Sequence, residues 1–487
     1  MKVLLSGYNL DSDTIEEMKQ KSGWDKDNVS PETLSAAYAR ISRDPRDIDV
    51  LRKAAREEVE KSRKSNQAII FGLGHSSVAE HAYFNFDIIG LSRLAVEYVQ
   101  KFRFASYTEK SQRYITLDDD YIVPKEIVDA GFESEFNEVV RYQNEVYQEL
   151  YLELKDYLFK IFPEEIKTKN GKRTVDGWAK EDARYVVSMA TESQFGMSVN
   201  ARSLENMLRE FGSSPLDEVR ELGKKLYALV KDLSPSIIKY VEPTDYDIKN
   251  PKELKEFALT KCFTPETNHG DRDVTLINIS PDTDNLILTV ILSSQTGMSF
   301  DNCKKSIQAM GYEEKDVLIK KALNYRMSYD SVSRHFEFAD ALFEINISST
   351  NYAQLKRHRI ASMITHPYDI RLGVTIPPNI QKIDKTDVFN AVISKTEKLY
   401  SKLEKVIPEH APYILNNAHK RKILVKMNFR ELYHFMSLRL DQHAQWDIRK
   451  TAEDMKDEIL KHAPLTAMMF CGKSEFKEQK IIVFGDE

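Results

Sequence analysis

At 487 residues the chain is too long for one ordinary domain, so two domains are the first expectation. A composition of 41% hydrophobic and 30% charged residues is that of a folded globular protein and excludes a disordered chain. The formal net charge of −6 argues against broad nucleic-acid binding, although it leaves room for a local basic pocket.

The apolar residues form no run of about 18 or more, so no membrane span is expected. The first residues, MKVLLSGYNLDSD, reach Asp11 and Asp13 too soon for a secretory signal. Cys262, Cys303 and Cys471 lie far apart and without metal-ligand spacing, which is typical of reduced thiols. We therefore expect a cytoplasmic protein.

In chain order, the sequence predicts helices and strands without a regular alternation. Residues 82–90 (AYFNFDIIG) alternate as a half-buried strand does, and residues 91–102 are typical of a helix. Residues 136–162 and 390–407 each have the apolar spacing of a long amphipathic helix. This mixture predicts the α+β class, with a mixed sheet flanked by long helices, rather than a doubly wound sheet.

The chain also repeats itself. The stretch KFRFASYTEKSQRY (101–114) aligns with RHRIASMITHPYDI (357–370), 256 residues later. A second stretch, VNARSLENMLRE (199–210), aligns with MNFRELYHFMSLRL (427–440), 228 residues later. An insertion explains the difference between the two offsets. Repeats of this length indicate a duplicated domain.

Three further pairs keep the same order along the chain. They are EDARYVV (181–187) with EHAPYIL (409–415), residues 1–15 with 273–287, and residues 229–241 with 458–470. Turn residues and few apolar ones mark 241–253 as the linker. The sequence therefore predicts two tandem homologous domains, residues 1–245 and 246–487.

In the first half, Glu109, Ser111 and Arg113 recur at every second position. In an extended segment these side chains would share one side. A carboxylate, a hydroxyl and a guanidinium suit a polar ligand with an anionic end, since arginine offers a planar fork to phosphate. The alternative is an exposed charged loop.

In the second half, residues 356–359 (KRHR) form a dense basic cluster. Its alternatives are a solvated patch or a nucleic-acid contact. Apolar residues surround it, among them Leu355 and Ile360, and a buried basic cluster needs an anion.

The stretch 428–449 would be a helix with two polar sectors. Asn428, Arg439, His443 and Trp446 fall within about 60° of arc, and Arg430, His434 and Gln445 form a second sector. This pattern predicts a helix with ligand on more than one side, or else a polar core helix.

Several motifs are absent. His75 and His81 have no third ligand at a recognised spacing, so we expect no metal site. Neither a Rossmann fingerprint nor a P-loop is present, and no cysteine has the neighbours of a thiolate nucleophile.

At these residues the sequence resembles the flavin-dependent thymidylate synthases, and the resemblance covers most of the chain as two copies. The family signature is Arg-His-Arg-x-x-Ser-x-Asn-Glu-x-Ser-x-Arg-Tyr, with a Gly-His block before it and Asn-x-Arg and His-Ala-Gln-Trp elements after it. The first half matches at Gly74-His75, Glu80-His81, Phe84, Phe86, Ser92-Arg93, Ser106, Glu109, Ser111, Arg113, Tyr114, Asp182-Ala183-Arg184, Asn200 and Arg202. The second half matches at Gln354, Arg357, His358, Arg359, Ser362, Asn428, Arg430, Leu438-Arg439 and His443-Ala444-Gln445-Trp446.

The two halves depart from the family in complementary ways. The first half has lost the Arg-His-Arg element, where it reads Lys101-Phe102-Arg103, and has Phe211 in place of the Leu-Arg arginine. The second half has Pro412 and Asp369 in place of two nucleotide-binding arginines.

The resemblance implies roles for these residues. Nucleotide binding is carried over to Glu109, Ser111, Arg113, Arg184, Gln354 and Arg439, of which Arg439, Ser111 and Glu109 are also expected to take part in catalysis. FAD binding is carried over to His75, Ser77, Arg357, His358, Arg359, Asn428, Arg430, His434 and His443.

The resemblance further implies an activity. The family methylates dUMP reductively to dTMP with FAD, NADPH and methylenetetrahydrofolate, and its members are homotetramers with sites between subunits. We expect a composite site with residues from both halves, and a homodimer that imitates the tetramer. Modification of another pyrimidine nucleotide, such as hydroxymethylation, and a non-catalytic nucleotide-binding paralogue stay open as alternatives.

Overall fold

The structure is a computed structural model. It describes residues 1–20, 30–41, 43–113, 115, 117, 120–261 and 272–485. Tyr114 and Cys262 therefore lie outside the described residues. The chain forms two compact units. Unit 1 comprises Met1–Pro265 and Asp387–Leu415, and unit 2 comprises Glu266–Thr386 and Asn416–Glu487.

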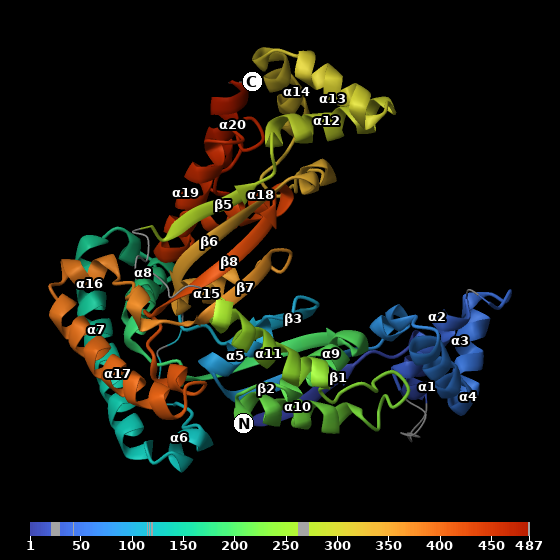
Figure 1. Cartoon of the computed structure of the whole chain (residues 1–487), viewed down its shortest axis with the longest axis horizontal. Coiled ribbons are helices and arrows are strands. Elements are labelled where there is room, and N and C mark those ends of the chain that lie inside the picture. The colour runs from blue at the N-terminus through green and yellow to red at the C-terminus, as the bar shows by residue number, and fades with distance from the viewer. Residues whose placement is uncertain are drawn as a thin grey trace. The chain divides into compact units, whose positions relative to one another are not determined.

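Each unit contains a four-stranded sheet, and the two sheets have the same strand order (Figure 1). In unit 1 the order is β1 (Lys2–Tyr8), β2 (Tyr83–Ser92), β4 (Glu192–Asn200), β3 (Ala105–Glu109). In unit 2 it is β5 (Val274–Ile279), β6 (Asp340–Ser348), β8 (Lys420–Asn428), β7 (Ser362–Tyr368). The α+β class is confirmed. All pairs between these strands are antiparallel, so the sheets are simpler than the mixed sheet we expected.

Helices make up most of the rest. Those of unit 1 are α1 (Ser12–Gln20), α2 (Glu32–Arg40), α3 (Ile48–Glu57), α4 (Val59–Gln67), η2 (Ala68–Gly72), η3 (Ser76–His81), α5 (Arg93–Gln100), α6 (Lys125–Asp129), α7 (Glu133–Ile161), η4 (Glu165–Lys167), α8 (Lys169–Ala183), η5 (Arg184–Val186), α9 (Ala201–Gly212), α10 (Asp217–Val230), α11 (Asp245–Lys261), α17 (Thr386–Val406) and η8 (Ala411–Ile414). Those of unit 2 are α12 (Thr283–Thr296), α13 (Phe300–Ala309), α14 (Tyr312–Leu323), η6 (Arg334–Phe338), α15 (Ser349–Leu355), η7 (Ile370–Leu372), α16 (Pro378–Lys382), α18 (Phe429–Arg439), α19 (Trp446–Leu460) and α20 (Phe476–Phe484).

The strand predicted over 82–90 is confirmed as β2. Phe84, Phe86 and Ile88 are buried, and the residues between them are exposed. This alternation places one face of the sheet on the core, as a period of two requires. The helix predicted over 91–102 is α5, and Ser92 caps it by accepting a hydrogen bond from the Ala95 amide.

The strand register confirms the duplication. Ser106 pairs with Ser198 in unit 1, and Ser362 pairs with Lys426 in unit 2. These pairs reproduce the offsets of 256 and 228 residues found in the sequence. Strand β2 carries a bulge at Gly90, where φ is 78°, whereas β6 pairs with β8 without a shift.

The opening strands correspond with a shift of one residue from our alignment. Val3 pairs with Ile88, and Val274 pairs with Ile345. Since Ile88 and Ile345 occupy the same position in their strands, Val3 corresponds to Val274. The alignment of residues 1–15 with 273–287 placed Val3 against Thr275 and is corrected by one position. Both strands are apolar here, so the sequence pattern did not fix the register.

The two long helices predicted over 136–162 and 390–407 are confirmed as α7 and α17, which lie side by side in unit 1 (Figure 1). Gln143 of α7 is fully buried, and its Nε2 donates to Oγ1 of Thr396 at 2.8 Å and to the Ile414 carbonyl at 3.0 Å. Unit 1 therefore includes a long helix from each predicted half. The boundary at residues 245 and 246 stays a prediction about the duplicated sequence.

Two helical expectations are corrected. The stretch 428–449 is not one helix, because α18 ends at Arg439 and Gln445 caps α19 by accepting from the Asp447 amide at 3.2 Å. The shared arc that we expected for Asn428, Arg439, His443 and Trp446 does not form. The predicted linker 241–253 is largely helical, since α11 begins at Asp245 and continues past it.

Candidate functional site

The side chain of Glu109 is the centre of a buried polar cluster in unit 1. It lies at the end of β3, and its carboxylate accepts from the Arg93 guanidinium, from Nε2 of Gln100 at 3.0 Å and from Oγ of Ser193 at 3.0 Å. The Arg93–Glu109 ion pair is almost completely buried. Several donors to one carboxylate offset its desolvation and hold it in one place.

Ser111 and Arg113 follow Glu109 in a turn, not in the extended segment that we expected. The Arg113 amide donates to Oγ of Ser111 at 3.2 Å, which closes a serine turn. The turn directs the Arg113 guanidinium to Glu181 of α8, where Nε donates to the carboxylate. Glu109 and Arg113 therefore do not project from one side of a strand, because the hydroxyl competes for the backbone.

Arg184 completes the polar group of unit 1. It begins η5, directly after α8, and is buried. Burial lowers the pKa of the Arg184 guanidinium; Glu181 opposes this shift, and the nearby charges of Arg113 and Arg93 add to it. Arginine keeps its charge over this range. Arg93, Arg113 and Arg184 thus lie near one another, and arginine is the side chain that suits a phosphate.

His75 and Ser77 lie on the exposed start of η3. The same element holds Glu80, whose Oε1 accepts from Nη1 of Arg202 at 2.5 Å. The equivalent pair in unit 2 is Glu337 with Arg430, at 2.7 Å. The structure thus ties Arg430 to η6, the second copy of this element.

The predicted residues of unit 2 converge on His358. Nε of Arg439 donates to Nε2 of His358 at 3.0 Å, and Nη2 of Arg439 donates to the Gln354 carbonyl at 2.9 Å. The ring of His434 lies 5.6 Å from that of His358. Of the predicted residues, Gln354, His358, His434 and Arg439 form one cluster.

His358 is neutral in this cluster. Burial lowers its pKa well below the usual range, and the neighbouring Arg439 acts in the same direction. Because Nε2 accepts from Arg439, the proton resides on Nδ1, which faces Oε1 of Glu431 at 3.3 Å. Burial also raises the pKa of Glu431. Glu431, His358 and Arg439 therefore form a chain of side-chain contacts that fixes the orientation of the Arg439 guanidinium.

The predicted flavin residues differ in how they are placed. Arg357 and Arg359 are exposed on the turn after α15, on either side of the buried His358. Asn428 caps α18, since its Oδ1 accepts from the Glu431 amide at 2.8 Å. His443 is exposed in the turn between α18 and α19. Exposed arginines can bind phosphate, and the amide nitrogen of Asn428 can donate to a carbonyl oxygen.

The sequence does not indicate which side chains hold the predicted site residues in place. The sequence marks Arg93 only as part of a block that matches the family, although this residue forms the ion pair with Glu109. No sequence pattern predicts a role for Glu181. Glu431 stands three residues after Asn428, and this spacing, which is typical of a helix start, is the only feature of the sequence that marks it.

The described residues contain neither a metal-binding group nor a helix that could span a membrane. No group of three or more His, Cys, Asp or Glu side chains is placed to hold a metal ion. No helix in the described part of the chain is both long and apolar enough to span a membrane.

The fold and the two polar clusters define a duplicated α+β protein with a buried cluster of arginines and carboxylates in one unit and an arginine-rich turn in the other. The family model for "Thymidylate synthase complementing protein" matches residues 26–236 and again 275–465. The chain belongs to this family and contains two copies of its domain. The family resemblance in the sequence is thereby confirmed.

Known relatives are of both single and double length. A flavin-dependent thymidylate synthase of Clostridium tetani is 31% identical over 44% of this chain and 84% of its own length. A "UPF0159 protein" of Thermoplasma acidophilum is 24% identical over 88% of this chain and 91% of its own. Among solved structures, a UMP/dUMP methylase from Streptomyces cacaoi is 18% identical, with a TM-score of 0.34, and matches over 44% of this chain and 95% of its own.

Proposed function

We propose that this chain is a flavin-dependent nucleotide methyltransferase that methylates dUMP reductively to dTMP, with methylenetetrahydrofolate as carbon donor and NADPH as reductant. Membership of the family and similarity to flavin-dependent thymidylate synthases support the coarser part, a flavin-dependent enzyme that acts on a nucleotide. The substrate and the two co-substrates are the finer part of the proposal.

One observation carries the proposal: the two halves have lost different halves of the family's residues. The first half keeps Arg113 and Arg184, at positions where the second has Asp369 and Pro412. Random decay would strike the same positions in both copies as often as different ones. Complementary loss is what selection for one shared active site would leave.

The second half supplies the other part of this pattern. It keeps His358 and Arg439, and the first half has Phe102 and Phe211 at those positions. The hydrogen bond between these two residues fits a retained function, since it orders the guanidinium. We infer that both halves contribute to one kind of active site, and that two chains form a dimer with the arrangement of a tetramer.

The chain's own residues have distinct tasks in this proposal. Arg113 and Arg184 bind the phosphate, and Gln354 contributes to nucleotide binding. Arg439 stabilises negative charge that develops on the uracil carbonyls, because it is held in place before the reaction. Glu109 and Ser111 orient the ring that reacts.

The flavin residues of the proposal are mainly in the second half. Arg357, Arg359 and Arg430 would hold the FAD phosphates, and His358, His434, His443 and Asn428 would position the rest. In the first half, His75 and Ser77 are the proposed contacts. Bound FAD would supply the electrons that reduce the transferred one-carbon unit. We place this reaction in the cytoplasm, with no nucleic-acid or membrane partner.

The first test is the visible absorption spectrum of the purified protein, before and after NADPH, with and without dUMP. A flavin band that NADPH bleaches and that responds to dUMP is the expected result, followed by dTMP formation in the complete reaction. Absence of flavin after addition of FAD would overturn the redox proposal. A reducible flavin that is indifferent to dUMP would mean a different pyrimidine substrate.

The shared site has its own test. Arg113→Ala and Arg439→Ala alter residues of different halves, and each should lower turnover on its own. Full turnover in both variants would refute a site to which both halves contribute.

A further inference from the structure

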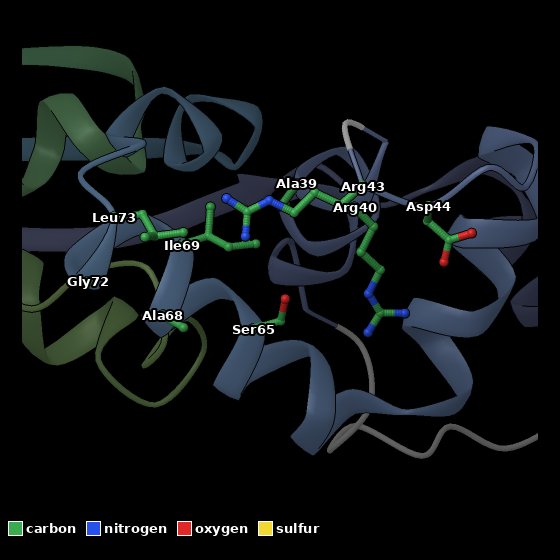
Figure 2. A pocket seen from close by; sticks show the side chains of 9 residues that line it. All are labelled: Ala39, Arg40, Arg43, Asp44, Ser65, Ala68, Ile69, Gly72 and Leu73. Atoms are coloured by element: carbon green, nitrogen blue, oxygen red, sulfur yellow. The ribbon is translucent and has the colours of Figure 1, made fainter.

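Unit 1 has a pocket whose lining contains none of the residues assigned a role in the proposed reaction. Its volume is about 560 Å³, and it lies between the end of α2 and the helical run from α4 into η2 (Figure 2). The lining residues are Ala39, Arg40, Arg43, Asp44, Ser65, Ala68, Ile69, Gly72 and Leu73. This size is that of sites for small organic ligands, which span roughly 300–1,000 Å³.

The pocket has an excess of positive charge. Asp44 is its only acid, and both of its carboxylate oxygens accept from Arg46, at 2.9 and 2.7 Å. This hydrogen-bonded pair with Arg46 lowers the pKa of Asp44 to about 2. The carboxylate is therefore committed to a residue outside the lining, and the charges of Arg40 and Arg43 dominate.

The two arginines are held differently. Nη2 of Arg40 donates to Oγ of Ser62 at 2.9 Å, and the buried Ser62 donates in turn to the Ala55 carbonyl at 3.1 Å. Arg43 is exposed, and within the described residues its guanidinium has no hydrogen bond or ion pair. The Arg40 guanidinium is thus held in place, whereas the Arg43 guanidinium can reorient to bind a ligand.

Part of the pocket lining is apolar. Ala68, Ile69 and Leu73 form this part, and Leu73 is 54% exposed although it is a large aliphatic side chain. Ala68 and Ile69 belong to η2, a single π-helical turn that Leu73 follows, and such turns occur frequently at functional sites. Aliphatic side chains and two arginines in one pocket match a ligand with one apolar part and one anionic part.

We propose that this pocket binds a phosphate-bearing nucleotide moiety, with its phosphates on Arg40 and Arg43 and its base against Ile69 and Leu73. Two arginines match the roughly double negative charge of a terminal phosphate better than the single charge of a carboxylate. Two sources share this chemistry: the adenylate end of FAD and a separate nucleotide such as the reduced nicotinamide coenzyme. The proposal does not require the methylation reaction, since it concerns binding alone.

The test is calorimetric titration of the full chain, free of flavin, with ADP. The variants are Arg40→Gln and Arg43→Gln, and the control is Lys64→Gln, which removes one exposed charge from α4 without touching the pocket lining. Each arginine variant should weaken ADP binding about tenfold or more, and the control should leave it unchanged. Because Arg43 is exposed, its replacement should not disturb folding.

Three outcomes decide the proposal. Inorganic pyrophosphate should compete with ADP, and adenosine should compete less. If protein loaded with FAD no longer binds ADP, the pocket holds the adenylate end of the flavin; if it still does, the pocket serves a separate nucleotide. Absence of ADP and pyrophosphate binding, or an equal Kd in all four proteins, would overturn the proposal. None of these readouts depends on dTMP formation, so a failure here is distinct from a failure of the proposed reaction.

Discussion

Arg430 donates from Nη1 to Oε1 of Glu337 at 2.7 Å, and the first copy of the domain repeats this ion pair as Arg202 with Glu80 at 2.5 Å. The two arginines are equivalent in sequence and in local structure. They differ in their surroundings, since only the second copy keeps the Arg-His-Arg element.

Replacement of these two arginines should have unequal effects on flavin binding. We expect Arg430→Ala to weaken FAD binding about tenfold to a hundredfold, and Arg202→Ala to leave it unchanged, if only the second copy holds the flavin phosphates. The measurement is flavin fluorescence on titration of apoprotein. Both variants lose a partly exposed ion pair, so both should lose little stability. Equal loss of flavin in both variants would contradict the assignment.

His358 should act as an uncharged positioning residue for Arg439. His358→Leu removes the acceptor at Nε2, and we expect the rate of dTMP formation to fall about tenfold or more, because Arg439 loses its fixed orientation. His358→Gln keeps an acceptor and a donor and should restore part of the rate. The control His462→Ala alters an exposed histidine.

The same residue predicts a pH dependence of stability. The pKa of His358 is lowered by burial, so its contribution to stability is present above the unfolded pKa of about 6.5 and is lost as pH falls below it. The free energy of unfolding should therefore fall more steeply between pH 6.5 and 5 in the wild type than in His358→Gln. Parallel curves would show that folding does not lower the pKa of His358.

Much of the fold could be predicted from the sequence. The offsets of 256 and 228 residues reappear as strand register, because strands with buried faces tolerate no slip. The helices α7 and α17 follow from apolar spacing alone. What the sequence could not show is that both helices lie in one unit, since an apolar stripe does not specify its partner.

The site was less predictable than the fold. The break after Arg439 has no glycine or proline to mark it, and the cap at Gln445 is not among the usual N-cap residues. The chain turns at Arg113 because the Arg113 amide donates to Oγ of Ser111. This side-chain bond replaces strand pairing, and the spacing of the residues does not predict it. Carboxylates such as Glu181 and Glu431 acquire their roles only from long-range packing.

The contact between α7 and α17 should contribute to the stability of unit 1. Gln143→Leu leaves the Ile414 carbonyl without its donor in a buried setting, and we expect a loss of about 1–3 kcal/mol in the free energy of unfolding. Lys402→Ala removes an exposed pair with Glu135 between the same two helices and should change little. Urea unfolding measures the free energy of unfolding of both variants, and limited proteolysis measures how readily residues 387–415 are cleaved. Equal stability of Gln143→Leu and wild type would mean that α17 does not depend on this buried contact.

Glu218 should make unit 1 less stable as pH rises. Its carboxylate accepts from the Ser92 amide at 2.7 Å, from Oγ of Ser92 at 2.6 Å and from the Tyr413 hydroxyl at 2.9 Å. Burial nevertheless raises its pKa, against the opposing effect of the hydrogen bonds from Ser92 and Tyr413. A raised pKa in the folded state means that the protonated form is favoured by folding. The contribution is therefore complete below the unfolded pKa of about 4.3 and is lost as pH rises through the folded pKa.

Glu218→Gln tests this directly, because glutamine has the same size and stays neutral. Denaturant unfolding at several pH values from 4.5 to 8 should show a smaller decline in the variant than in the wild type. The control Glu221→Gln lies on the same helix, is exposed and pairs only with Lys225, so it should keep the wild-type slope. If Glu218→Gln and Glu221→Gln decline equally, the carboxylate of Glu218 is ionised throughout this range, and its hydrogen bonds outweigh its burial.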